Sequence, residues 1–217
     1  METRFVDKTE TEGPGASRSW VRRWPLRLLL LIALGCASAP AAAQTPVTRG
    51  VALSFAANDV EFLNMLGDLE APRGFDSVSG FAPVPPPLPF AEMTLDEVLA
   101  YQRRIRAMGT VSSAVGRYQF IYPTLKRLVT EQGISGTLRF DAEVQTYLAR
   151  FLMHDCGFFD PGTDRLRLGN CLAHVWAALP LVSGPQTGRS AYADDGINRA
   201  LTSPSFFLAV LERRFEW

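Results

Sequence analysis

The sequence predicts a mainly helical protein with at most a small sheet. Apolar side chains recur at helical spacing in several stretches, and capping residues or prolines stand where those stretches begin. The sequence contains neither βαβ alternation nor an internal repeat. At 217 residues, with 47% hydrophobic and 20% charged residues, the chain is long enough for one domain with a sizeable core.

The first expected helix spans residues 58–70, with Asn58 as its N-cap and Glu70 at its end. The proline and glycine that follow stop it, because proline disfavours helical dihedrals in the residue before it and glycine releases the turn. Residues 75–81 allow a short strand or hairpin. The proline-rich segment Pro83–Pro89 predicts extended, polyproline-like chain, which serves either as a stiff connector or as a partner-binding segment.

Helical signals then continue to the C-terminus. Thr94 and Glu97 form a capping box at the start of a helix that reaches about Met108. Residues 169–179 are apolar nearly all round, which predicts the most buried helix of the domain. Further helices are expected at 124–132 behind Pro123, from the capping residue Asp141 onward, and from Ser203 and Pro204 to the end of the chain.

The N-terminus has the layout of a signal peptide. Arg22, Arg23 and Arg27 precede a short apolar run, and Ala41-x-Ala43 offers a cleavage site. The apolar run is too short for a convincing membrane span. We therefore expect a signal peptide with an upstream tail at 1–43, a short tail at 44–55 and a folded domain at 56–217.

The cysteines fit an exported protein. Cys36 lies in the segment expected to be removed, which leaves Cys156 and Cys171 as a pair that an oxidising periplasm allows to form a disulfide. Acylation of Cys36 as a lipoprotein is the less favoured alternative, because Ala33 stands where such sites usually have leucine. We expect a periplasmic or secreted protein.

Composition and missing motifs exclude several function classes. With 22 basic and 22 acidic side chains, the chain has no basic field for nucleic-acid phosphates. Its two histidines, His154 and His174, do not form a zinc motif, and there is no G-x-S-x-G elbow or phosphate-binding glycine loop. The aspartates Asp155, Asp160 and Asp164 lack the spacing of a calcium loop. Carboxylate chemistry without metal or cofactor remains.

Glu70 fits carboxylate chemistry through its position. It ends an apolar helix and so faces the negative end of the helix dipole, where a carboxyl holds its proton more tightly. A carboxyl that stays protonated near neutral pH can donate to a glycosidic oxygen. Position alone nevertheless favours a plain solvent-facing glutamate, so the assignment depends on the rest of the sequence.

Three segments carry a family resemblance, in the same order along the chain. The first runs from Phe62 through Glu70 to Gly80, the second is Ser113–Phe120 with its Gly-Arg-Tyr-Gln motif, and the third is Val175–Pro180 with Trp-Ala-x-Leu-Pro. Together they resemble the lambda-phage-type endolysins over residues 55–215. That family is similar in fold to the soluble lytic transglycosylases and goose-type lysozymes of the lysozyme-like superfamily.

The resemblance implies an α+β lysozyme-like domain over 56–217, with a helical lobe and a small sheet-bearing lobe flanking a cleft. It implies cleavage of the β-1,4 bond between N-acetylmuramic acid and N-acetylglucosamine in peptidoglycan, with Glu70 as the catalytic acid and no cofactor. The substrate-binding residues that it implies are Asp76, Gly116, Arg117, Tyr118, Gln119 and Tyr192.

Several alternatives stay open. We expect lytic transglycosylation, which needs one carboxyl, whereas a water-using lysozyme would need a second carboxylate, for which Asp76 is the candidate. An inactive peptidoglycan-binding protein of the same fold is the other alternative. Asp76 is equally compatible with a turn-forming role, and Tyr118 and Trp176 with core packing. The expected partners are peptidoglycan strands and an envelope machine, and the chain is expected to be a monomer.

Overall fold

The computed structural model describes residues 57–216, which belong to one compact unit. The regular structure of these residues is helical, which confirms the mainly helical class. The expected signal peptide, Cys36 and the tail up to residue 55 lie outside the described residues. The elements are α1 (Val60–Glu70), α2 (Leu95–Ala107), α3 (Tyr122–Glu131), α4 (Ala142–Asp155), α5 (Arg165–Val175) and α6 (Pro204–Glu212), with 3-10 turns η1 (Gly74–Asp76), η2 (Phe90–Glu92), η3 (Ala193–Asp195) and η4 (Arg213–Phe215).

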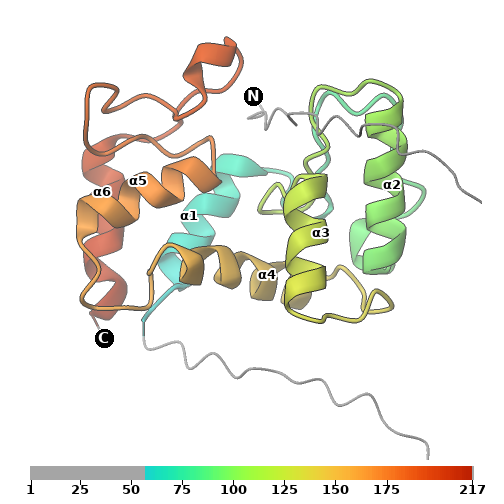
Figure 1. Cartoon of the computed structure of the whole chain (residues 1–217), viewed down its shortest axis with the longest axis horizontal. Helices are drawn as coiled ribbons and strands as arrows, with labels where there is room; N and C mark the ends of the chain where they lie inside the picture. The colour runs from blue at the N-terminus through green and yellow to red at the C-terminus, as the bar shows by residue number, and fades with distance from the viewer. Residues whose placement is uncertain (1–56, 217) are drawn as a thin grey trace, which may run out of the picture. The chain divides into compact units, whose positions relative to one another are not determined.

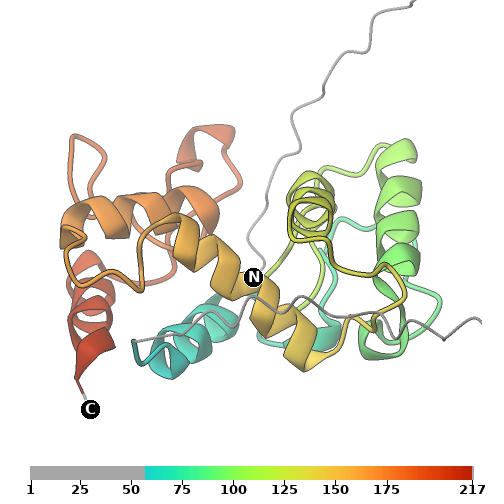
Figure 2. The same ribbon diagram turned by 60° about the horizontal axis from the view of Figure 1, so that its bottom comes forward.

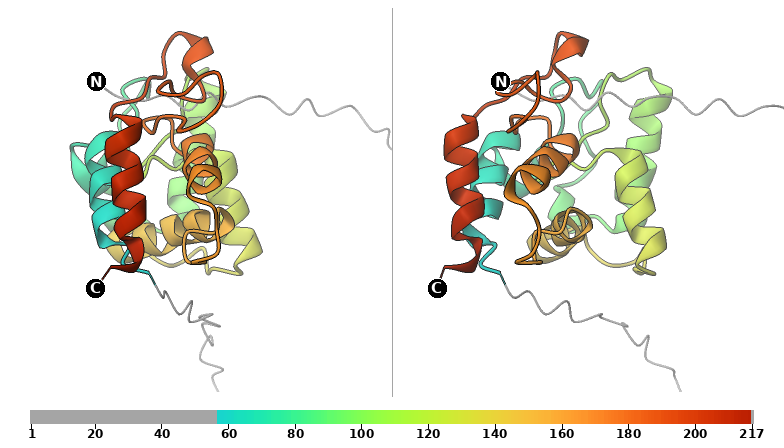
Figure 3. Two further views of the ribbon diagram at one scale, coloured as in Figure 1. Left: turned by 90° about the vertical axis from the view of Figure 1, so that its left-hand side faces the viewer. Right: turned by 60° about the vertical axis from the view of Figure 1, so that its left-hand side comes forward.

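The helices form two groups that α4 connects (Figures 1 and 2). In one group α2 packs on α3, and in the other α5 and α1 pack on α6. Figure 3 shows α6 running along α1 on one side of this unit. Helix α4 runs between the two groups (Figure 2), and its C-terminal half reaches both: Asp155 pairs with Arg127 of α3 at 3.4 Å, and Arg150 pairs with Asp59 at the start of α1.

Extended structure in residues 57–216 is limited to isolated bridges. Val115 pairs with Val78 and with Phe120, and two further bridges join Thr94 to Arg139 and Pro180 to Ser190. Residues 75–81 do not form a hairpin of their own. Gly74 takes a positive φ of 82°, and the N–H of Ser77 returns to the Gly74 carbonyl, so η1 uses a donor that a strand ladder would need.

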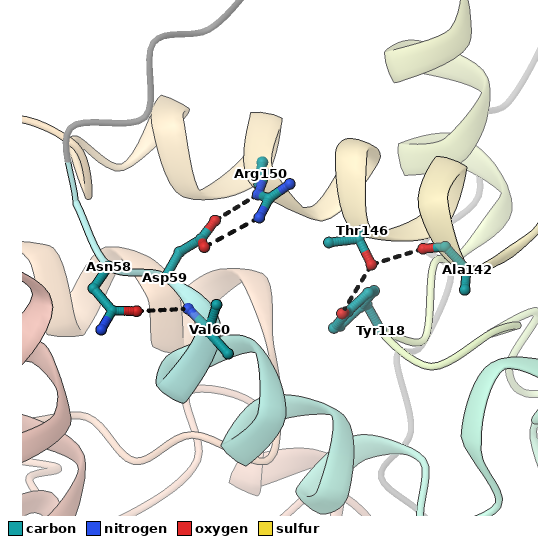
Figure 4. Close-up of polar contacts among 7 residues, drawn as sticks. All are labelled: Asn58, Asp59, Val60, Tyr118, Ala142, Thr146 and Arg150. Carbon is teal, nitrogen blue, oxygen red and sulfur yellow. Dashed lines mark hydrogen bonds and ion pairs between the residues drawn. The ribbon is translucent and has the colours of Figure 1, made fainter.

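The start of α1 differs from the expected cap. Asp59 takes the N-cap position, but its carboxylate accepts two hydrogen bonds from the Arg150 guanidinium, at 2.5 and 3.1 Å (Figure 4). Asn58 Oδ1 instead accepts the N–H of Val60 at 3.3 Å. Asp59 is committed to a partner 91 residues away, which local capping rules cannot anticipate. The ion pair fastens the beginning of α1 to α4.

Three other predicted helix starts are confirmed. The capping box of α2 is present, because Thr94 Oγ1 accepts the Glu97 N–H and Glu97 Oε2 accepts the Thr94 N–H. Asp141 caps α4 by accepting the N–H of Val144 at 3.0 Å. Ser203 caps α6 in the same way, with Pro204 as the first helical residue.

The bounds predicted for the helix at 169–179 are wrong. Asp164 caps α5, which therefore begins at Arg165 with an exposed first turn and ends at Val175. The buried residues 176–179 leave the helix, and Trp176 is extended, with φ −123° and ψ 116°. The Trp176 N–H makes the last helical bond, to the Leu172 carbonyl, whereas the Ala178 N–H bonds to the Glu70 carboxyl outside the helix. Apolar periodicity continued past the helix into this buried turn.

A disulfide joins Cys156, just after α4, to Cys171 in α5, which is the expected pair. Between the helices of this half lies an aromatic cluster in which Phe62 contacts Phe158, Trp176 and Phe207, with ring centroids 5.2–6.3 Å apart. Within residues 57–216, no helix has both the length and the apolar character to span a membrane.

Candidate functional site

Glu70 is buried at the C-terminal end of α1, with only 2% of its surface exposed. It continues the buried face formed by Leu63, Leu66 and Gly67, because residues three and four apart share one side of a helix. Its Oε1 accepts a hydrogen bond from the backbone N–H of Ala178 at 3.0 Å. The carboxyl therefore points into the fold and is not the solvent-facing side chain that its sequence position alone favours.

The three segments singled out in the sequence meet beside Glu70. Ala178, which bonds to Glu70, belongs to the third segment, and Trp176 of that segment donates from Nε1 to the Tyr118 carbonyl at 3.1 Å. Tyr118 belongs to the second segment. The buried turn at 176–179 therefore connects the end of α1 to the loop that carries Gly116-Arg117-Tyr118-Gln119.

Residues 116–119 form a tight loop closed at its base. Val115 and Phe120 exchange two backbone hydrogen bonds, at 3.1 and 2.9 Å. Gly116 has a positive φ of 77°, and a Cβ there would lie 2.4 Å from Gln145 Oε1, so both the conformation and the close approach require glycine. Gly116 therefore contributes its backbone conformation to the loop and has no side chain to offer a ligand. Gln145 fills the space that a side chain would occupy.

Gln119 is the strained residue of this loop. Its φ of 47° is positive, which costs a non-glycine residue free energy and is concentrated at functional sites. Gln119 Nε2 donates to the Gly116 carbonyl at 2.8 Å, while Oε1 is buried and finds no hydrogen-bond partner among the described residues. A buried unpaired acceptor is uncommon in native proteins.

A pocket of about 270 Å³ adjoins this loop. Tyr118 and Gln119 line it together with Trp176 and Tyr192, so the structure gathers three of the predicted substrate-binding residues around one hollow. Glu70 does not line it and lies behind the 176–179 turn. His174 is also part of the pocket wall.

Tyr192 is held in this wall by its own hydroxyl, which donates to the His174 carbonyl. Burial raises the pKa of Tyr192 above its ordinary value of 10, so the phenol is protonated at neutral pH. Tyr118 also makes a contact away from the pocket, because its hydroxyl lies 3.3 Å from Thr146 Oγ1 on α4 (Figure 4). Both tyrosines are therefore fixed by the protein and present an edge or face to the hollow.

Arg117 and Asp76 do not line the pocket. The Arg117 guanidinium lies on α1, where Nη2 donates to Asp68 Oδ1 at 2.8 Å. Asp76 is exposed in η1, and its Oδ1 accepts the backbone N–H of Ala91 in η2, 15 residues away, at 3.2 Å. The structure therefore separates these two side chains from Tyr118, Gln119 and Tyr192.

Gln145 is an organising residue that sequence reasoning missed. Its Oε1 accepts the Arg117 N–H at 2.8 Å, and its Nε2 donates to the Phe75 and Phe140 carbonyls at 3.0 and 2.9 Å. The residue is fully buried on α4. A signal was present, because Gln145 shares a helical face with the buried Leu148 and Ala149, where a polar side chain needs buried partners.

Within residues 57–216, no three His, Cys, Asp or Glu side chains gather in a way that could hold a metal ion. Comparison of the chain with family models, with curated proteins and with solved structures found no match.

Proposed function

We propose that this protein is a peptidoglycan-cleaving enzyme of the lysozyme-like superfamily, similar to the lambda-phage-type endolysins, with Glu70 as its acid. The observation that carries the proposal is the burial of Glu70 at the end of α1, bonded to Ala178 and linked through Trp176 to the Tyr118 loop. A carboxyl whose surroundings keep it protonated can donate its proton to a glycosidic oxygen.

The proposed substrate is the glycan strand, cleaved between N-acetylmuramic acid and N-acetylglucosamine. Tyr118, Gln119 and Tyr192 line the pocket that would receive a sugar, and the two tyrosines supply ring surface there. The proposal keeps the small sheet-bearing lobe as an expectation; residues 57–216 contain isolated bridges of Val115 with Val78 and Phe120.

The proposed reaction is lytic transglycosylation. In the proposed step Glu70, whose Oε1 accepts the Ala178 N–H, enters the reaction with a proton on its carboxyl group. That proton moves to the bridging oxygen as the C1–O bond breaks. The 6-hydroxyl of the muramic acid then bonds to C1 and returns its proton to Glu70, which restores the acid and leaves a 1,6-anhydro product without water.

Hydrolysis by water is the nearest alternative within enzymes. It would use a second carboxylate, and the sequence candidate Asp76 is already bonded to Ala91 N–H in an exposed turn. The structure thus favours the mechanism with a single carboxyl. Mass spectrometry of digested sacculi separates the two outcomes, because anhydro-muropeptides are expected from transglycosylation and reducing muramic acid ends from hydrolysis.

An inactive peptidoglycan-binding protein is the second candidate function. The observation that favours it is the position of Glu70 behind the pocket wall, where its bond to Ala178 can serve the fold alone. The Glu70→Gln variant separates the candidates. It keeps an acceptor for Ala178 N–H and removes the transferable proton, so an enzyme loses activity while a binder keeps its affinity for sacculi.

The experiment measures sacculus clearing and sacculus binding by wild type, Glu70→Gln and the matched control Glu143→Gln, an exposed glutamate of α4. We expect clearing by wild type and the control, and binding without clearing by Glu70→Gln. Equal clearing of sacculi by Glu70→Gln and wild type would show that Glu70 is not the acid.

We further propose that the protein is exported to the periplasm or cell exterior, that it is a monomer, and that an envelope machine is its second partner.

A further inference from the structure

We propose that Arg117 is a positioning residue that clamps the C-terminal end of α1, and with it Glu70, to the 116–119 loop. In this arrangement Gly67 is the helix position that makes room for the guanidinium. The proposal reassigns Arg117 from the substrate-binding role expected from the sequence. The placement of Arg117 between α1 and the loop follows from contacts within the chain. The effect of Arg117 on catalysis rests on the proposed function.

Gly67 is the first piece of evidence. It lies inside α1, where glycine is less favourable than alanine, so its presence needs a reason. A Cβ at Gly67 would lie 2.2 Å from Arg117 Nε and 2.5 Å from Cζ, closer than real Cβ contacts come. Any side chain at this position therefore displaces the guanidinium from the helix.

The contacts of the guanidinium are the second piece of evidence. Arg117 Nη2 donates to Asp68 Oδ1 at 2.8 Å and approaches the Asn64 carbonyl at 3.4 Å, which places it along one turn of α1. Its Cζ lies 5.6 Å from the centre of the Phe75 ring. Only 17% of the side chain is exposed. The group is thus enclosed between Phe75 and the α1 surface around Gly67, one turn before Glu70.

The backbone of Arg117 is fixed from the opposite side. Its N–H donates to Gln145 Oε1, and the same Gln145 donates to the Phe75 carbonyl. Arg117 therefore connects α4 to the end of α1, while the Asp59–Arg150 ion pair connects α4 to the beginning of α1 (Figure 4). Both ends of α1 are therefore attached to α4, the beginning through Asp59 and the C-terminal end through Arg117.

The experiment measures amide hydrogen exchange at Ala178 by NMR, because this N–H reports its bond to Glu70 Oε1. The variants are Arg117→Ala, Gly67→Ala and the double variant, with exposed Arg103→Ala on α2 as the control. We expect each single change to speed Ala178 exchange by about ten-fold or more relative to helix-core amides, which report global opening. The double variant should add little, because both changes remove the same contact.

The Gly67→Ala variant is the most informative of the three. Alanine favours helix formation, so α1 is not weakened as it would be by a core truncation. Loss of Ala178 protection with global stability kept therefore supports positioning. The positioning role would be overturned if exchange at Ala178 speeds up only as much as exchange at the helix-core amides. It would also be overturned if the effects of the two single variants add up in the double variant. If Arg117→Ala does not fold, Asp68→Ala removes one contact of the guanidinium at an exposed partner and is read in the same way.

Kinetics on soluble glycan fragments supply the second readout. A positioning role predicts that kcat falls by about ten- to a hundred-fold while KM stays the same, because a misplaced acid slows the chemical step. A rise in KM at constant kcat would instead make Arg117 a substrate contact and overturn the proposal. If wild type shows no cleavage at all, the proposed function fails, and the exchange result still decides the positioning of Glu70.

Discussion

Replacing Arg150 by methionine should destabilise the domain by about 3 kcal/mol, because it leaves a buried carboxylate without its cation. Asp59 is 4% exposed and receives both of its charge-assisted hydrogen bonds shown in Figure 4 from Arg150. Loss of one partner of a buried pair costs roughly 3–5 kcal/mol. The Arg150 side chain is 28% exposed, so water partly screens the pair and the lower end of that range applies.

Urea unfolding of wild type, Arg150→Met and the exposed control Arg103→Met measures this loss. For a domain of this size, a loss of about 3 kcal/mol lowers Tm by roughly 6–12 °C. The double variant Asp59→Asn/Arg150→Met should recover part of the loss, because a neutral amide is less costly to bury than an anion. A loss below about 1 kcal/mol for Arg150→Met, as surface pairs show, would refute the anchoring role.

Two further predictions concern the stability of the fold. The Cys156→Ser/Cys171→Ser variant should lose about 3 kcal/mol of unfolding free energy, because the disulfide closes a loop with a sequence separation of 15. In unfolding assays, a reductant should destabilise wild type and leave the variant unchanged. Equal sensitivity of both proteins to the reductant would contradict the loop-closure account. Hydrogen bonds from Thr94 lower the pKa of Glu97 below its ordinary value of 4.5, so its contribution to stability is present above pH 4.5 and is lost as pH falls through the lowered pKa. Glu97→Ala should therefore be less stable than wild type at neutral pH, with the difference shrinking in acid, and a difference that does not vary with pH would argue against this role.

Local signals in the sequence predicted local structure well. Thr94 with Glu97, Asp141 and Ser203 start helices as expected, because a cap depends on residues within one turn of the chain. The burial of Glu70 is also compatible with the periodicity of α1, since it continues the face of Leu66.

The features that sequence reasoning missed depend on contacts between distant segments. The sequence predicts Asn58 as the N-cap of α1, whereas Asp59 takes that position and its carboxylate bonds to Arg150 on α4 instead of capping the helix. The end of α5 was placed too late, because Trp176 is apolar enough to continue the helical pattern although its side chain bonds to the Tyr118 carbonyl. Arg117 was assigned to substrate from its motif, whereas its position beside Gly67 becomes visible only in three dimensions.

The central claim is that Glu70 donates a proton to the glycan. The most direct measurement is the initial rate at which purified wild type and Glu70→Gln release soluble muropeptides from sacculi, at equal concentrations of folded protein. Loss of a general acid predicts a rate lower by about 10²–10⁴-fold, with sacculus binding kept. A Glu70→Gln rate within a few-fold of wild type would contradict the account.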